Sequence, residues 1–306
     1  KKNVYQQQSN VCIEFAVEID NYTRETFASD LQAINWATAI FAGVSQIYEA
    51  QTPASLIIVD FIIWNTNDPY ESFNSTDAVL YELQDYWIDN NTSINRDLVH
   101  LMSKRDLGGG IAFLDALCSN NWGYAFSADL NNNTSFQFPD PDYTWNFGCV
   151  AHEIGHNIGS QHTHNCDWDA DASLSFSGGP IDNCVDVEGS CPNNVESEIG
   201  TIMSYCHLTG SGIVLDFHEV VLSQALLPGI ESAQCLSECL PLTWDCVDGG
   251  CFERTDGSGV FSSIDDCQSN CICTANDVIL NFLPDCYGVE TSWTLSNDLG
   301  EILAFK

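Results

Sequence analysis

The segment from His152 to His162, which reads HEIGHNIGSQH, constrains the fold more than any other part of this chain. On an α-helix, residues four apart lie one turn apart on the same face, so His152 and His156 point the same way. The residues on the opposite side are apolar, as expected of a helix with one face in the core. Gly159 can adopt the left-handed conformation that ends a helix and reverses the chain. The reversal lets His162 approach the other two imidazoles.

Three converging imidazoles predict a zinc site. Zinc held by three histidines keeps a fourth position for water and lowers the pKa of that water to about 7. Glu153 follows the first histidine and faces the same cleft, so it can take a proton from the water and deliver it to a leaving amine. The segment therefore predicts peptide hydrolysis by zinc-activated water with Glu153 as general base. The plain alternative is a set of solvated histidines on a helix face.

The chain has 306 residues, enough for a domain of about 200 residues and something smaller. Its longest apolar run, Leu56 to Trp64, is interrupted by Asp60 and falls short of the ~18 residues that a membrane span needs. A net charge of −35 repels nucleic acid and anionic membranes. We expect a monomer that acts on proteins or peptides and binds neither nucleic acid nor membranes.

Fifteen cysteines suit an oxidising compartment, so we expect a secreted, extracellular protein. The odd count leaves at least one thiol free or paired outside the chain, and Cys149 is a candidate for a buried, inert thiol. The chain opens Lys1-Lys2-Asn3-Val4 without an apolar leader. We therefore expect any secretion signal or pro-segment to be absent from the mature chain.

The hydrophobic pattern predicts an α+β fold. We expect a strand at residues 11–19, a long amphipathic helix between Phe27 and Tyr48, and a second helix capped by Thr76. Residues 56–63 predict a strand covered on both faces, and further strands are expected at 98–102 and 111–114. The order predicts a mixed sheet with helices packed on it.

The second half of the chain loses this regular patterning. Between about residue 160 and Ile213, small and polar residues dominate, so we expect loops held by disulfides. Cys246, Cys251, Cys267 and Cys271 fall in a stretch too small to bury a core without cross-links. We expect a catalytic domain at 1–238, a small cysteine-rich module at 239–272 and a partial β-type segment at 273–306.

The histidine segment resembles the signature of the metzincin metallopeptidases, HExxHxxGxxH followed by a methionine turn. The segment Gly200-Thr201-Ile202-Met203-Ser204-Tyr205 looks like that turn, which would place Met203 beneath the zinc. The resemblance implies a twisted, mixed five-stranded sheet with long helices and a loop-rich C-terminal subdomain. Within the clan, the first 240 residues look most similar to the adamalysin (reprolysin) branch and its secreted bacterial relatives. The features that carry this similarity are the strand around Glu14, the segment 101–118, the cysteine-bearing loop after His162, and Cys235.

The same resemblance implies a calcium ion opposite the active site. Its ligands would be Glu14, Asp106, Glu238 and the Cys235 carbonyl, with Cys118 bonded to Cys235. Ordinary surface carboxylates are the alternative. In metzincins the substrate lies along an edge strand above the zinc, which favours endopeptidase action on extended polypeptides. The matching residues here are Gly109, Gly110, Ile111, Ala112 and Phe113.

The chain also departs from the adamalysin pattern. Thr163 follows the third histidine where adamalysins usually have Asp, and Met203-Ser204-Tyr205 resembles the astacin and serralysin turn. Tyr205 could bind the metal, hydrogen-bond the oxyanion or simply pack. His164 is expected at the surface and not as a fourth ligand, because catalytic zinc keeps a position for water.

Two other hypotheses compete with the hypothesis of a metzincin protease. One is a catalytically retired, metal-stabilised binding protein or adhesin, although a complete set of ligands with Glu153 argues against lost activity. The other is a zinc hydrolase of a different fold, which typically uses a glutamate or a distant histidine as third ligand.

Overall fold

The computed structural model describes residues 11–192, 195, 199–239, 243–247, 250–254, 259–271, 294–296 and 302–305. The chain divides into two compact units, residues 1–239 and 240–306. Most of the expected third segment, 273–306, lies outside the described residues. No helix in the described part of the chain is both long and apolar enough to cross a membrane.

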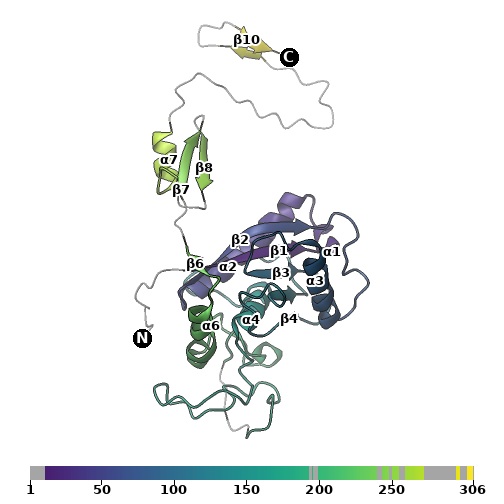
Figure 1. Ribbon diagram of the computed structural model, residues 1–306, viewed down its shortest axis with the longest axis vertical. Helices are drawn as coiled ribbons and strands as arrows, with labels where there is room; N and C mark the ends of the chain where they lie inside the picture. Colours follow the sequence, from purple (N-terminus) through teal and green to yellow (C-terminus); the bar gives the residue numbers. More distant parts are fainter. Residues whose placement is uncertain are drawn as a thin grey trace. The chain divides into compact units, whose positions relative to one another are not determined.

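A mixed sheet forms the centre of the first unit (Figure 1). Its strand order is β2-β1-β3-β5-β4, and a short β6 pairs with the start of β1. Strands β2, β1, β3 and β5 are parallel, whereas β4 and β6 run antiparallel to their neighbours. The bounds are β1 Val11–Ile19, β2 Ala54–Ile63, β3 Leu98–Met102, β4 Gly110–Ala112, β5 Tyr124–Ser127 and β6 Ser237–Glu238. The expected α+β class with a mixed sheet is confirmed.

Helices cover both faces of this sheet. Successive residues of a strand point to opposite faces, and Ile13, Phe15 and Val17 of β1 join the core formed with α2 and α4. Ala16 points the other way, into the core formed with α3. The long helices are α2 Asp30–Glu49, α3 Thr76–Asn90 and α4 Trp145–Ile158. Shorter helical segments are α1 Asn21–Arg24, η1 Cys206–Leu208, α5 Glu219–Val221, η2 Leu222–Leu226 and α6 Leu227–Ser232.

Three local expectations were wrong. Strand β2 lies at the edge of the sheet, with β1 as its partner among the described strands, and most of its residues are half-buried, so it is not covered on both faces. Thr76 is the first residue of α3 and Ser75 holds the cap position, without a side-chain hydrogen bond. Helix α2 begins at Asp30, after Phe27, because the Ser29 side chain accepts a hydrogen bond from the backbone N–H of Gln32 and caps the helix there.

A buried carboxyl group fixes α3 on the sheet. Glu18 is fully buried on β1 and accepts hydrogen bonds from the Trp87 indole at 2.6 Å and the Tyr70 hydroxyl at 2.8 Å. The Trp64 indole donates to the same carboxyl group. Burial raises the pKa of Glu18 to about 7, although these three donors oppose the shift. The group therefore titrates near neutral pH.

Disulfides hold the loop-rich part of the first unit. Cys166 pairs with Cys191 and Cys184 with Cys206, while the expected Cys118–Cys235 bond is confirmed. A further bond, Cys12–Cys239, joins the start of β1 to the end of the unit. Cys149 is buried and is the one cysteine among the described residues that forms no disulfide.

The second unit contains a disulfide-linked hairpin and helix. Strands β7 (Thr243–Val247) and β8 (Gly250–Arg254) pair antiparallel, and α7 (Ile264–Asn270) follows. Two bonds cross-link these elements, Cys246–Cys271 and Cys251–Cys267. Strands β9 (Thr294–Ser296) and β10 (Ile302–Phe305) pair with each other.

Candidate metal centre

Helix α4 is anchored to elements on both sides. The Tyr48 hydroxyl of α2 donates to the Ala151 carbonyl at 2.9 Å. On the side facing the strands, the Asn157 amide donates to the carbonyls of Phe113 and Tyr124 at 2.9 and 3.1 Å. Both contacts are buried or partly buried, so they fix the rotation of α4 relative to β4 and β5.

The helix ends as its glycine predicts. Gly159 has φ +122° and its N–H donates to the carbonyls of Gly155 and His156. The Ser160 N–H also reaches the Gly155 carbonyl, at 2.9 Å, which closes a capping motif at the C-terminus of the helix. The chain therefore reverses directly after α4 and returns His162 to the histidine face.

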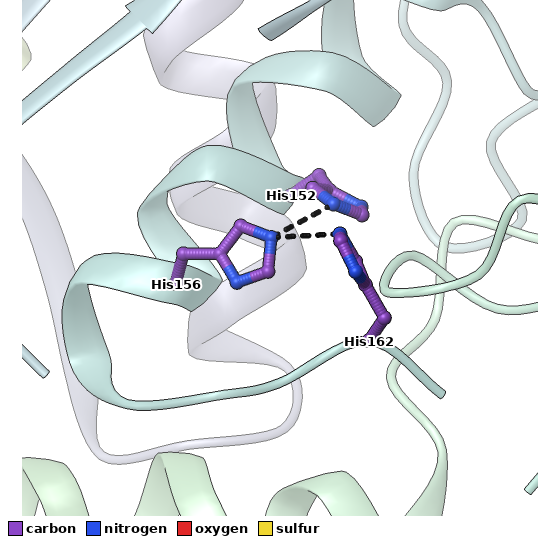
Figure 2. A group of neighbouring side chains, drawn as sticks. All are labelled: His152, His156 and His162. Carbon is purple, nitrogen blue, oxygen red and sulfur yellow. Dashed lines mark hydrogen bonds between the residues drawn. The ribbon is translucent and has the colours of Figure 1, made fainter. Parts of the chain in front are cut away.

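The three histidines converge, as Figure 2 shows. His156 Nε2 lies 3.1 Å from His152 Nε2 and 3.1 Å from His162 Nε2. Two imidazole ligands of one tetrahedral zinc, each at about 2.05 Å, lie about 3.3 Å apart. The spacing of the three nitrogens therefore fits a single zinc ion.

Hydrogen bonds at the other ring nitrogens support this fit. His152 Nδ1 lies 2.7 Å from the Ile202 carbonyl and His156 Nδ1 lies 2.7 Å from the Ser160 carbonyl. A carbonyl only accepts hydrogen bonds, so each Nδ1 carries the proton and each Nε2 presents a lone pair. Burial lowers the pKa of His152 well below its usual value and that of His156 to about 4, which favours the neutral rings that bind metals.

Glu153 lies next to this group and faces the cleft. Its side chain is 4% exposed, and its Oε2 has no hydrogen-bond partner within the described part of the chain. Burial raises the pKa of the Glu153 carboxyl well above its usual value. A buried carboxyl oxygen without a partner is costly, so its placement beside three metal-binding nitrogens is consistent with a reactive role.

The methionine turn lies beneath the helix. Met203 is fully buried, and a Cβ atom built on Gly155 would lie 2.6 Å from Met203 Sδ. The Met203 carbonyl accepts a hydrogen bond from the Thr163 N–H at 3.0 Å, which ties the turn to the segment after His162. The Tyr205 hydroxyl lies 3.0 Å from His162 Nε2, within reach of a bound metal.

The two residues that follow the third histidine, Thr163 and His164, differ from expectation. The Thr163 hydroxyl donates a hydrogen bond to the buried Asp182. Adamalysins usually carry Asp at the position of Thr163, and here a carboxylate from a distant loop lies next to that position instead. The expectation of a surface His164 was wrong, because His164 is 2% exposed and stacks on His162 with ring centroids 5.0 Å apart. It stays outside the group formed by the three converging nitrogens.

A cleft adjoins the centre. Its volume is about 460 Å³ and its walls include His152, Glu153 and the predominantly apolar side chains Tyr143, Trp145, Leu208 and Ile213. Gly109 and Gly110 line the same cleft, and Gly110 opens β4, the strand at the edge of the sheet. Ile111, Ala112 and Phe113 continue along that strand and just beyond it. No other strand in the described part of the chain pairs with the outer edge of β4, so this backbone edge borders the cleft.

The structure brings together only part of the expected calcium set. Glu14 and Cys235 line one polar hollow of about 250 Å³, together with Asp97. The Glu14 N–H donates to the Asp97 carboxylate at 2.8 Å, and burial, with the Asp97 charge as a second cause, raises the pKa of Glu14. Asp106 does not line this hollow, and it follows the opposite end of β3 from Asp97. Glu238 is exposed on β6 and does not line the hollow.

Sequence reasoning missed Asp97, Asp182 and Glu188, which contacts His162. Asp97 directly precedes a predicted strand that neighbours the strand of Glu14, a signal that could have pointed to it. Asp182 and Glu188 lie in an irregular loop, where no periodic pattern indicates which side chain points inward.

Comparison with known proteins decides the family. Residues 8–213 match the model of a reprolysin group described as metallopeptidase family M12. This chain belongs to metallopeptidase family M12. The resemblance to the adamalysin (reprolysin) branch is thereby confirmed.

Individual relatives of this M12 metallopeptidase are distant. Disintegrin and metalloproteinase domain-containing protein 1 of Rattus norvegicus is 24% identical over 154 residues, which is 49% of this chain. The match spans only 18% of the length of that relative. A solved structure titled "Structure of a chaperone-substrate complex" has a TM-score of 0.39 and 13% identity, covering 56% of this chain and 28% of that chain. So weak a likeness carries no weight for fold or function.

Proposed function

We propose that this M12 metallopeptidase is a secreted, zinc-dependent endopeptidase. The observation that carries the proposal is the convergence of the Nε2 atoms of His152, His156 and His162, with Glu153 beside them. Bound zinc would supply a Lewis acid for the scissile carbonyl and lower the pKa of an attacking water. Secretion is supported by the six disulfides among the described residues.

Glu153 would act as the general base. It directly follows the ligand His152 on α4, and the positive charge of a bound metal would favour its ionised form. It takes a proton from the attacking water and transfers it to the nitrogen of the leaving amine. The Tyr205 hydroxyl, next to His162 Nε2, can donate a hydrogen bond to the oxyanion or bind the metal.

The substrate would be an extended polypeptide. The free edge of β4 offers main-chain hydrogen bonds to any sequence, which suits endopeptidase action. The adjoining cleft, walled by Tyr143, Trp145, Leu208 and Ile213, is large enough for an apolar side chain next to the scissile bond.

Cleavage of a casein-type substrate tests this function. Activity should disappear with a zinc chelator, return with zinc, and fall at least 1,000-fold in Glu153→Gln, which keeps all three metal ligands. Glu231→Gln, a matched change at an exposed position on α6, should keep full activity. Zinc binding without cleavage in the wild type would favour the rival reading, a metal-stabilised binding protein. Full proteolysis by metal-free protein would refute the proposal.

We also propose that calcium binds in the hollow of Glu14, Asp97 and the Cys235 carbonyl. Burial and, second, the Asp97 charge raise the pKa of Glu14, although Arg96 lines the same hollow and its charge opposes the burial that raises the pKa of Asp97. A hard cation with oxygen ligands would remove the repulsion that remains between the two carboxylates. Calorimetric titration of chelator-treated protein should show uptake of calcium that Asp97→Asn weakens. If the wild type shows no heat of calcium binding, the proposed calcium site is refuted.

A further inference from the structure

The third histidine differs from the other two in the partner of its Nδ1. His152 and His156 contact neutral main-chain carbonyls, whereas His162 Nδ1 lies 2.7 Å from the carboxylate oxygen Oε1 of Glu188. We propose that Glu188 is a positioning residue that orients His162 and strengthens metal binding. The inference rests on the proposed zinc function and deepens it.

The need for such a residue follows from where the ligands lie. His152 and His156 are held by helix α4, whose rotation is fixed by hydrogen bonds to both neighbouring layers. His162 follows the glycine that ends the helix, in a segment without regular secondary structure. A ring on such a segment needs a side-chain contact to fix its orientation.

The backbone around Glu188 is built to hold that contact. The Glu188 N–H donates to the His164 carbonyl at 3.1 Å, and the Glu188 carbonyl accepts from the Cys166 N–H at 2.9 Å. These bonds form a short parallel bridge between Asn165 and Glu188. The loop that carries Glu188 therefore lies directly beside the segment that follows His162.

A disulfide closes the same loop. Cys166 is bonded to Cys191, three residues after Glu188. Gly189 packs against this bond, because a Cβ atom built there would lie 3.0 Å from Cys166 Cβ. The carboxylate is thus presented by a cross-linked loop, which reduces the entropy lost when it meets the imidazole.

The carboxylate also has secondary contacts. The Asn165 amide donates to Glu188 Oε2 at 3.3 Å, and His164 Nε2 lies 3.4 Å from Glu188 Oε1. His164 in turn stacks on His162, with an interplanar angle of 10°. His164 therefore covers one face of the His162 ring, and Glu188 contacts the edge of that ring at Nδ1.

A carboxylate changes the imidazole more than a carbonyl does. It accepts a hydrogen bond from Nδ1–H, so the lone pair stays on Nε2, and its negative charge makes that lone pair a stronger donor to a metal. The Glu188 side chain is 43% exposed, so solvent screens part of this effect. Loss of such an outer partner typically weakens metal binding about 10- to 100-fold, and the exposure places the expected effect near the lower end.

Zinc affinity of the whole chain tests the inference. The zinc dissociation constant is measured by competition with a chromophoric chelator for the wild type, Glu188→Gln, Glu188→Ala and the exposed control Glu231→Gln. Glu188→Ala should weaken zinc binding about tenfold or more. Glu188→Gln should lie between it and the wild type, because the amide oxygen still accepts the hydrogen bond from Nδ1–H but carries no charge. The visible spectrum of the cobalt-substituted protein should change in the same order.

The outcomes separate the two proposals. A Glu188→Ala variant that binds zinc within twofold of the wild type overturns the role of Glu188 and leaves the proposed function intact. A wild type that binds no zinc overturns both. Unfolding of the metal-free variants, followed by circular dichroism, should match the wild type, which distinguishes loss of positioning from loss of fold.

Discussion

Gly110→Ala should disable catalysis without disturbing the metal ligands. A Cβ atom built on Gly110 would lie 2.6 Å from both Cδ and Cγ of Glu153, whereas carbon atoms in contact are normally about 3.5–4.0 Å apart. Because β4 is held by its pairing with β5 and α4 by its anchors, the Glu153 carboxylate must move by about 1 Å. A displacement of that size costs about 100-fold in rate, or about 2.7 kcal/mol in the activation free energy.

The assay is kcat/KM on a fluorogenic peptide together with the zinc content of each preparation. Gly110→Ala should lose about 100-fold in kcat/KM and keep one zinc per chain. Gly210→Ala is the matched control, because a Cβ atom at Gly210 meets nothing within 4 Å. If Gly110→Ala keeps more than a third of the wild-type activity, catalysis does not depend on the present position of the Glu153 carboxylate. Loss of zinc would show that the strain passes to the ligands instead.

Three further changes test other parts of the structure. Burial raises the pKa of Glu18 to about 7, so in the folded state Glu18 keeps a proton that the unfolded chain releases above about pH 4.5. The protonated group therefore contributes to the free energy of unfolding at low pH, and this contribution is lost as pH rises through 7. Glu18→Gln should therefore gain about 3 kcal/mol relative to the wild type between pH 4.5 and 8 in urea unfolding; a constant difference would contradict the assigned pKa. Gly155→Ala should lower the free energy of unfolding by about 1–3 kcal/mol, because its Cβ would overlap Met203 Sδ, and an unchanged midpoint would refute that packing. Tyr205→Phe should lower kcat at least tenfold with little change in KM, and unchanged turnover would leave Tyr205 a packing residue.

The sequence determined the local geometry of the centre. The four-residue spacing of His152 and His156 and the glycine stop at Gly159 are properties of a single helix and its end, so they follow from the turn and rise of that helix. The bounds of β1 and β3 likewise follow from runs of apolar residues. The short strand β5 gave no such signal, because four residues do not define a period.

Tertiary structure decided every partner that comes from a distant loop or strand. The sequence alone could not distinguish Asp97 from Asp106, because which end of β3 lies beside Glu14 depends on the pairing of β1 with β3. It gave no sign that β2 is an edge strand, since strand order is not encoded in the pattern of one strand. The contact of Glu188 with His162 depends on a disulfide-closed loop without periodicity. Periodic patterns report only how a segment turns on itself, whereas these contacts depend on how separate segments pack together.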